Sequence, residues 1–359
     1  MKKIPGINFI FHTIARAGGM ERAVVDMICG FAAKGIPVRG IAMRTDISVF
    51  PENLRDKIEL IRVPAKFPWN LSQRFANWDF ENRAASFCKP GWKIISASRV
   101  PAPTDMAISG GTHLAHLQKK GKKKPSLTDK MTMAHEVALY SQAKICVAHS
   151  QMTRDEIVAL NATSPEKVIC LFPLANIEKF NLSTRNSRHE IRQKWNVSNK
   201  TFVLLFPSND HVRKGGPLIL SALDALDDPD IVLAVASRHP INHPRVINIG
   251  YTPEIEKYYA AADASILASR YEPFGLVGVE SILCGTPTLL SEFCGAVDAL
   301  SEPGCIKFKH TTEGLCKAIL TAKKRKEEGF LFLDNPDSSI HYPFSIEKHI
   351  DALLNLLYR

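Results

Sequence analysis

Short apolar strands alternate with amphipathic helices along most of this 359-residue chain. The pattern predicts a strand at 7–11, a helix at 21–34 and a second strand at 37–43. The same alternation returns later, with strands predicted at 202–206, 231–235, 265–267 and 287–290 and helices between them. Because alternating strands and helices form parallel sheets covered on both faces, we expect an α/β fold.

A polar stretch that begins with Pro173 separates two such arrays. We therefore predict two doubly wound Rossmann-like domains, over 1–175 and 176–344, that face each other across a cleft. Ligands of parallel sheets bind at the carboxyl ends of the strands, so the cleft is the expected site. The last segment, 345–357, is apolar at 346, 350, 353, 354 and 357, and an amphipathic helix of this kind needs a partner surface.

The net charge of +10 lies entirely in the first half of the chain. Residues 1–175 carry 25 Lys/Arg and 14 Asp/Glu, or +11, whereas residues 176–359 carry 21 and 22, or −1. The densest cluster of lysines is at 119–124. This asymmetry indicates an anionic partner such as a membrane surface, a nucleic acid or an acidic substrate, although a lysine run can also be a solvated loop.

Several classes of protein are disfavoured by the sequence. No run approaches the ~20 apolar residues of a membrane helix, and the N-terminus does not resemble a secretory leader, which favours the cytoplasm. The eight cysteines form no C-x-x-C pair, so no zinc ribbon is indicated. The Asp228-Pro229-Asp230 segment has the spacing of a metal site but the composition of a turn, so we expect no metal cofactor.

The strongest functional motif is at 271–280, which reads YEPFGLVGVE between a predicted strand and a predicted helix. A helix N-terminus favours a phosphate, and Gly275 allows its backbone to approach a ligand closely. Glu272 precedes the helix, and Glu280 lies among apolar helix residues, so burial and a polar partner are expected for Glu280. The alternative is that Glu272 caps the helix and Glu280 lies at the surface.

This glutamate pair, followed by the sequence CGTP at 284–287, resembles the donor signature of the family 4 retaining glycosyltransferases, which have the GT-B fold. The resemblance implies that Glu280 binds the ribose of the nucleotide and Glu272 the hydroxyls of the sugar. It also implies that the backbone amides of Phe274, Gly275 and Leu276 face the diphosphate or the sugar.

A second motif, SNDHVRKGG at 208–216, resembles the Arg-Lys-Gly segment of the same family. There Arg213 and Lys214 would hold the diphosphate. Glycosyl transfer expels a nucleoside diphosphate, and preorganised cations stabilise the negative charge that grows on it. Two adjacent basic residues on a loop also occur by chance.

Two motifs in the first half complete the resemblance. AGGMER at 17–22 is similar to the family's loop that faces the donor phosphates, which implicates Gly18 and Gly19. SGGTH at 109–113 supplies His113 as the histidine that the family often places near the reacting sugar. An ordinary loop histidine is the alternative, and His116, His135 and Glu136 are further candidates.

The resemblance spans the chain and is strongest to bacterial lipopolysaccharide core glycosyltransferases. It implies a hexosyltransferase that uses a nucleoside-diphosphate sugar, such as a UDP-sugar, retains the anomeric configuration and needs no metal. It also implies a glycan or glycolipid acceptor, a C-terminal helix (345–359) packed on the first domain, and a cytoplasmic protein whose basic domain can contact an anionic membrane. No nucleic-acid partner is expected.

Three alternatives stay open at this point. A GT-B sugar-nucleotide epimerase would use the same diphosphate site without an acceptor. A basic polyanion-binding protein would explain the charge, but the sequence contains no recognised nucleic-acid module. A catalytically silent GT-B protein would have no need for the glutamate pair.

Overall fold

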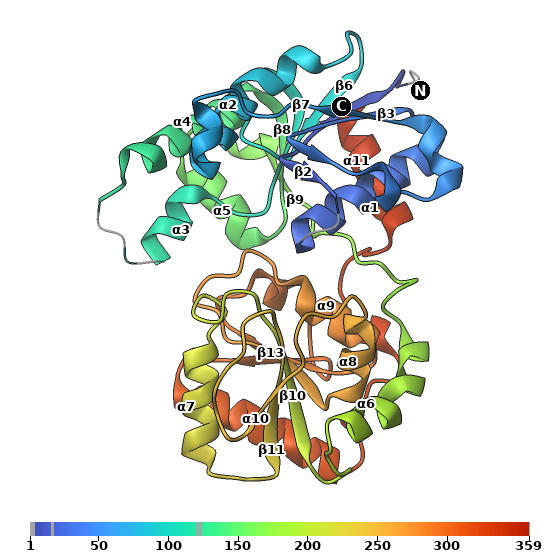
Figure 1. Ribbon diagram of the computed structural model, residues 1–359, viewed down its shortest axis with the longest axis vertical. Coiled ribbons are helices and arrows are strands. Elements are labelled where there is room, and N and C mark those ends of the chain that lie inside the picture. The colour runs from blue at the N-terminus through green and yellow to red at the C-terminus, as the bar shows by residue number, and fades with distance from the viewer. Residues whose placement is uncertain (1–3, 16–17, 120, 122–123, 359) are drawn as a thin grey trace. The chain divides into compact units, whose positions relative to one another are not determined.

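The computed structural model describes residues 4–15, 18–119, 121 and 124–358 (Figure 1). The chain divides into two compact units, which are described separately below. Unit 1 comprises Met1–Leu174 together with Pro343–Arg359, and unit 2 comprises Ala175–Tyr342. The cleft expected between two domains stays a prediction.

Unit 1 is built on a parallel sheet with helices on both faces (Figure 1). Its strand order is β5-β3-β1-β6-β7-β8-β9, so the order reverses between β1 and β6. The strands are β1 (Ile7–Ile10), β3 (Val38–Ala42), β5 (Ile58–Arg62), β6 (Lys93–Ser96), β7 (Thr104–Ser109), β8 (Ala143–Ala148) and β9 (Val168–Cys170), with a separate pair β2 (Thr13–Ile14) and β4 (Arg44–Thr45). The helices are α1 (Gly19–Ala33), α2 (Gln73–Ala84), α3 (His113–Lys119), α4 (Leu127–Gln142), α5 (Gln151–Ala159) and α11 (Ile346–Leu357).

Unit 2 repeats the architecture with strand order β12-β11-β10-β13-β14-β15, which reverses between β10 and β13. Its strands are β10 (Phe202–Pro207), β11 (Ile231–Ala236), β12 (Val246–Asn248), β13 (Ala264–Leu267), β14 (Thr288–Ser291) and β15 (Cys305–Phe308). Its helices are α6 (Arg188–Lys194), α7 (Gly216–Leu226), α8 (Ile255–Ala261), α9 (Leu276–Leu283) and α10 (Thr312–Glu327). Both sheets are wholly parallel, which confirms the predicted α/β class.

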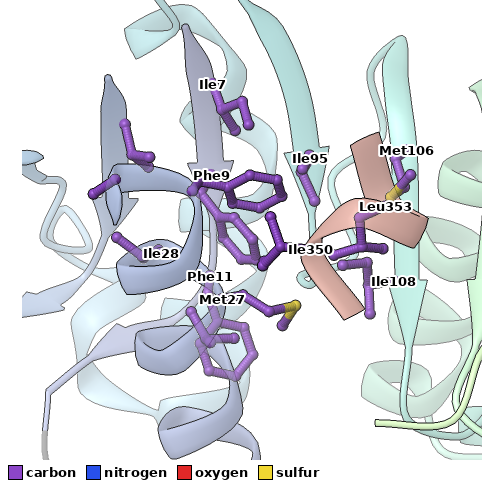
Figure 2. Packing of buried hydrophobic residues seen from close by; sticks show 14 of the residues in the cluster. Ile7, Phe9, Phe11, Met27, Ile28, Ile95, Met106, Ile108, Ile350 and Leu353 are labelled. Atoms are coloured by element: carbon purple, nitrogen blue, oxygen red, sulfur yellow. The ribbon is translucent and has the colours of Figure 1, made fainter. Parts of the chain in front are cut away.

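The C-terminal helix α11 belongs to the hydrophobic core of unit 1. Its buried Ile350 and Leu353 lie beside Phe9 of β1 and Ile108 of β7, as Figure 2 shows. The amphipathic pattern read from the sequence therefore serves to bury one face of the helix against the sheet. Among the described residues, no helix has both the length and the apolar character needed to cross a membrane.

Helix α1 approaches α11 at Gly30, where a Cβ atom would lie 2.5 Å from Ile350 Cγ1. We expect Gly30→Ala to destabilise unit 1, because the overpacking cost of about 1–3 kcal/mol exceeds the gain in helix propensity of about 1 kcal/mol. Gly19→Ala in the same helix is the matched control, since nothing lies within 4 Å of its added methyl group. Urea unfolding would show the difference, and equal stability of the two variants would contradict this packing.

Candidate functional site

Two loops of unit 2 meet at the point where its strand order reverses. The loop after β10 carries Arg213 and Lys214, and the loop after β13 carries Glu272 and Gly275. Arg213 Nη1 donates a hydrogen bond of 3.2 Å to Glu272 Oε2. The reversal point of a parallel sheet is where ligands of such folds bind, so the ion pair lies at the expected place.

The loop that carries Arg213 is fixed by its own backbone. Gly215 has a φ of +84°, and a Cβ atom there would lie 1.8 Å from the carbonyl oxygen of Ala268, in the loop after β13. The Ala268 amide donates to the Lys214 carbonyl at 3.2 Å, and Asp210 Oδ1 accepts from the Arg213 amide at 3.1 Å. Only glycine fits at this contact, and it brings the two loops together.

The two cations of this loop differ in how they are held. The half-buried Arg213 is paired with Glu272, whereas the Lys214 ammonium has, among the described residues, a single contact of 3.5 Å with the Pro207 carbonyl oxygen. Lys214 therefore keeps most of its hydrogen-bond donors for a ligand.

Helix α9 begins directly after the loop that carries Glu272. Gly275 is its N-cap residue with a φ of +97°, so Glu272 does not occupy the N-cap position. The buried Phe274 accepts a bond of 2.8 Å from the Ala296 amide, and Leu276 is the first helical residue. The N-terminus of α9 thus lies next to the Arg213–Glu272 pair.

Glu280 is buried in α9, with 5% of its surface exposed. Its Oε2 accepts a hydrogen bond of 3.0 Å from the hydroxyl of Tyr259, a fully buried residue of α8. The prediction of a buried, partnered carboxylate is confirmed. The two glutamates have different partners, since Glu272 contacts Arg213 and Glu280 contacts Tyr259.

The glycine motif of unit 1 lies at the equivalent place in the first sheet. Gly18 is the extended N-cap residue of α1, and Gly19 is the first residue of that helix, which follows β1 at the reversal point. The carbonyl of Gly18 accepts from the Arg22 amide at 3.2 Å. Arg16 and Ala17 lie outside the described residues, as do Lys120, Lys122 and Lys123 of the lysine cluster.

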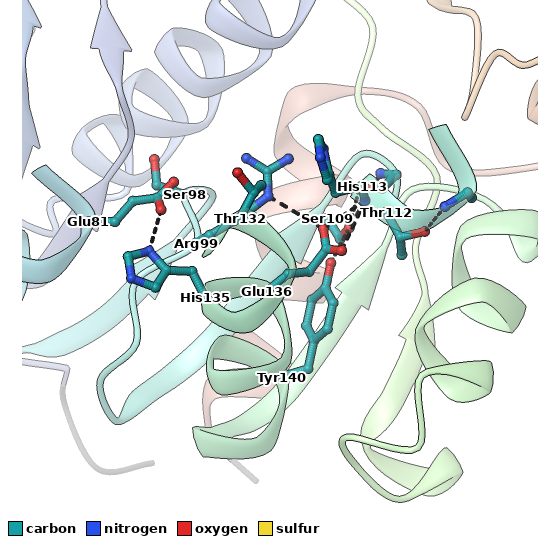
Figure 3. A network of polar contacts seen from close by, with 12 residues as sticks. Glu81, Ser98, Arg99, Ser109, Thr112, His113, Thr132, His135, Glu136 and Tyr140 are labelled. Carbon is teal, nitrogen blue, oxygen red and sulfur yellow. Dashed lines mark hydrogen bonds and ion pairs between the residues drawn. The ribbon is translucent and has the colours of Figure 1, made fainter. Parts of the chain in front are cut away.

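His113 is the first residue of α3, after β7, and two residues of α4 contact it. Figure 3 shows one of them, Glu136. Its Nε2 lies 3.1 Å from Asp129 Oδ1, and its amide donates to Glu136 Oε2 at 2.9 Å. Burial lowers the pKa of His113, although the bond to Asp129 opposes the shift. His135 instead contacts Glu81 at 2.6 Å.

The sequence and the fold both resemble known glycosyltransferases. Residues 187–328 match the family of glycosyl transferases group 1. A probable transglycosylase of Burkholderia thailandensis is 36% identical over 357 residues, which are 98% of this chain and 96% of that protein. The chain belongs to the group 1 glycosyltransferase family. A D-inositol 3-phosphate glycosyltransferase of Catenulispora acidiphila is 28% identical over 82% of this chain and 76% of its own length.

Solved structures of other glycosyltransferases share the fold of this group 1 glycosyltransferase. WaaG, a glycosyltransferase involved in lipopolysaccharide biosynthesis, aligns with a TM-score of 0.75 and 19% identity over 96% of this chain and 99% of its own. HepE of Anabaena, in complex with UDP and glucose, aligns with a TM-score of 0.74 and 16% identity over 98% and 99%. These alignments confirm the predicted GT-B fold with two Rossmann-like halves.

Sequence reasoning did not single out several side chains that fix the candidate residues of this glycosyltransferase. Tyr259 holds Glu280, Asp210 holds the Arg213 loop, and Asp129 holds His113. Tyr259 and Asp129 come from separate helices, so no local pattern links them to the residues they contact. The contact between Asp210 and the Arg213 loop could have been predicted from the sequence, because Asp210 lies three positions before Arg213 in the same loop.

Proposed function

We propose that this protein transfers a hexose from a nucleoside-diphosphate sugar, a UDP-sugar in the first instance, to a lipopolysaccharide or other cell-surface glycan, with retention of configuration. The observation that carries the proposal is the Arg213–Glu272 pair beside the N-terminus of α9. Cations, a carboxylate and a helix N-terminus at the reversal point of a parallel sheet suit a ligand that has both a diphosphate and a sugar.

Unit 2 is the proposed donor domain, and each residue has a role that follows from its contacts. Arg213 and Lys214 bind the diphosphate, with the less constrained Lys214 following the phosphate as charge develops. Glu280, held by Tyr259, accepts hydrogen bonds from the ribose hydroxyls, and Glu272 accepts them from the sugar. The backbone amides of Phe274, Gly275 and Leu276 face the diphosphate, which is favoured by the positive end of the helix dipole.

Transfer would break the bond between the anomeric carbon and the diphosphate oxygen and form one between that carbon and the acceptor oxygen. The departing diphosphate takes the proton of the acceptor hydroxyl on the same face of the sugar, which retains the configuration. Arg213 and Lys214 stabilise the charge on the leaving group, so we propose that no metal is required. Gly18, Gly19 and His113 of unit 1 are proposed to approach the donor phosphates and the reacting sugar.

The acceptor proposal rests on unit 1, the acceptor-side domain. The first half of the chain has a charge of +11, and unit 1 exposes large apolar side chains at Phe67, Leu71 and Leu127. Basic charge with exposed apolar side chains suits the surface of an anionic membrane that carries a glycolipid. The solved glycosyltransferase WaaG acts in lipopolysaccharide biosynthesis, and a peripheral position at the inner face of the cytoplasmic membrane follows from the same proposal.

A thermal-shift screen with UDP, GDP, ADP and CMP in EDTA tests the donor site. We expect one nucleotide to stabilise the protein by about 2.7 kcal/mol at ~100 times its dissociation constant. UDP is the first candidate, because the solved enzyme HepE binds UDP and UDP-glucose. Glu280→Gln should weaken this shift while leaving the melting temperature of the free protein near that of the parent, since the amide can still accept from Tyr259.

The absence of a shift with every nucleotide on folded protein would contradict the donor site, and a shift that appears only with added Mg²⁺ would contradict metal independence.

Loss of most transfer activity is expected in Glu280→Ala. An NMR time course with the donor sugar alone is the control against epimerisation, because a transferase leaves the sugar unchanged when no acceptor is present.

A further inference from the structure

A cavity of about 140 Å³ lies in unit 1, and of the residues given a role in the proposed transfer only His113 is among those that line it. Arg99 follows β6 and His113 follows β7, so the cavity opens at the carboxyl edge of the sheet, where parallel sheets bind ligands. Its remaining wall comes from α2 and α4. The charged and aromatic side chains that line it are Arg74, Trp78, Glu81, Arg99, His113 and Asp129.

The carboxylates of this cavity are already engaged. Glu81 accepts from His12 at 3.0 Å and from His135 at 2.6 Å. Asp129 accepts from the amide and hydroxyl of Ser126 at 2.8 and 2.6 Å and lies 3.1 Å from His113 Nε2. Both oxygens of each carboxylate already accept hydrogen bonds, so neither carboxylate needs a cationic ligand as a partner.

The guanidinium groups, in contrast, keep unused donors. Arg99 contacts Glu136 through Nε alone, at 3.4 Å, and its two terminal nitrogens have no hydrogen-bond partner among the described residues. Figure 3 shows these nitrogens turned away from Glu136. Arg74, whose side chain is 62% exposed, uses Nη1 for the Thr128 hydroxyl at 2.8 Å, and the same nitrogen lies 3.7 Å from Asp129 Oδ1. The free hydrogen-bond donors of the cavity thus belong to the guanidinium groups of Arg74 and Arg99, and such groups prefer carboxylate and phosphate oxygens as acceptors.

Trp78 adds a rigid aromatic wall to the cavity. Its ring stacks on His135 with centroids 5.9 Å apart and packs against Trp69 at 5.2 Å, so it is fixed before any ligand binds. A sugar ring has apolar C–H groups as well as hydroxyl oxygens. Arginine donors next to an aromatic wall therefore match a sugar that carries an anionic substituent.

We propose that this cavity binds a sugar residue bearing an anionic oxygen group, either a carboxylate or a phosphate, through Arg99 and Arg74. The cavity as a binding site stands on the geometry of unit 1. Its assignment to the acceptor rests on the proposed transferase function, and it narrows the acceptor to glycans that contain an acidic sugar next to the hydroxyl that is glycosylated.

Calorimetric titration of the full-length protein with D-glucose, D-glucuronate and D-glucose 6-phosphate tests the proposal. We expect at least one of the two anionic sugars to bind about 10-fold or more tightly than glucose. Arg99→Gln and Arg74→Ala should each remove this preference. The preference should survive in Arg62→Ala, an exposed arginine at the end of β5, and in Arg213→Ala, which excludes binding at the diphosphate site.

The exposed Arg74 keeps the test valid if Arg99→Gln does not fold. Equal binding of the three sugars, or a preference that persists in Arg99→Gln or in Arg74→Ala, would overturn the proposal. So would a preference lost in Arg213→Ala, because the anionic sugar would then occupy the donor site. Thermal shifts with nucleotides, measured on the same variants, test the transferase proposal separately from the cavity proposal. The absence of a nucleotide shift in the parent protein would contradict the transferase function, whereas the sugar titrations alone test whether the cavity binds an anionic sugar.

Discussion

Arg213→Ala should lower the kcat of sugar transfer by about 100- to 1000-fold, the usual loss when one preorganised donor to a developing negative charge is removed. The guanidinium group lies 3.2 Å from Glu272 and 3.8 Å from Asp210, so it is already oriented before the donor binds. Because charge on the diphosphate grows as the glycosidic bond breaks, the loss should fall mainly on kcat rather than on KM for the donor. Arg213→Lys should recover only part of the rate, since lysine restores the positive charge but not the planar guanidinium group that donates two parallel hydrogen bonds.

Release of the nucleoside diphosphate, measured with donor and acceptor both varied, separates these two constants. Lys194→Ala is the matched control, because it removes a cation of unit 2 whose ion pair, with Glu190 in α6, is exposed. A kcat for Arg213→Ala within about fivefold of the parent would exclude Arg213 from leaving-group stabilisation. A change confined to KM would reduce its role to ground-state binding of the donor.

The elements that depend on local periodicity could be predicted from the sequence. The predicted strand at 202–206 and the predicted helix at 21–34 correspond to β10 and α1. The burial of Glu280 was equally predictable, because its helix is otherwise apolar and a buried carboxylate requires a partner. Strands with polar residues, such as β7 with its Thr104 and Ser109 ends, were not assigned, since their pattern is weak.

Contacts between distant segments could not be predicted. The need for glycine at 215 depends on the carbonyl of Ala268, which is 53 positions away and reaches it only because β10 and β13 are neighbours in the sheet. The cavity of unit 1 likewise joins α2, α4 and the loops after β6 and β7, and Arg74 and Arg99 have no motif in common. His113 was predicted from a resemblance, but its support by Asp129 and Glu136 follows from one face of α4.

Unit 1 should lose stability steeply as the pH falls from 7.5 to 5.0, because it buries two uncharged histidines. Burial lowers the pKa of His149 to about 3 and that of His349, in α11, to about 4. His149 Nε2 and His349 Nδ1 have no hydrogen-bond partner among the described residues. In the unfolded chain both histidines have a pKa of about 6.5, so the unfolded chain binds protons more tightly than the folded protein does. The stability that is present above about pH 6.5 is therefore lost as the pH falls below that value.

The expected loss at pH 5.0 is about 2 kcal/mol for each histidine and about 4 kcal/mol together, a large part of the free energy of unfolding of an ordinary domain. Urea unfolding followed by tryptophan fluorescence measures it, because Trp69, Trp78 and Trp92 all lie in unit 1. The double variant His149→Gln/His349→Gln should have lower stability at pH 7.5 but a much flatter pH dependence, whereas His189→Gln, an exposed histidine, should behave as the parent. An equally steep loss in the double variant would assign the acid sensitivity to other groups. Ion pairs lower the pKa of Asp79 and Asp105, so these carboxylates titrate below this pH range. Burial also lowers the pKa of His113 and raises that of Glu136, so the share of His149 and His349 is the difference between the parent and the double variant.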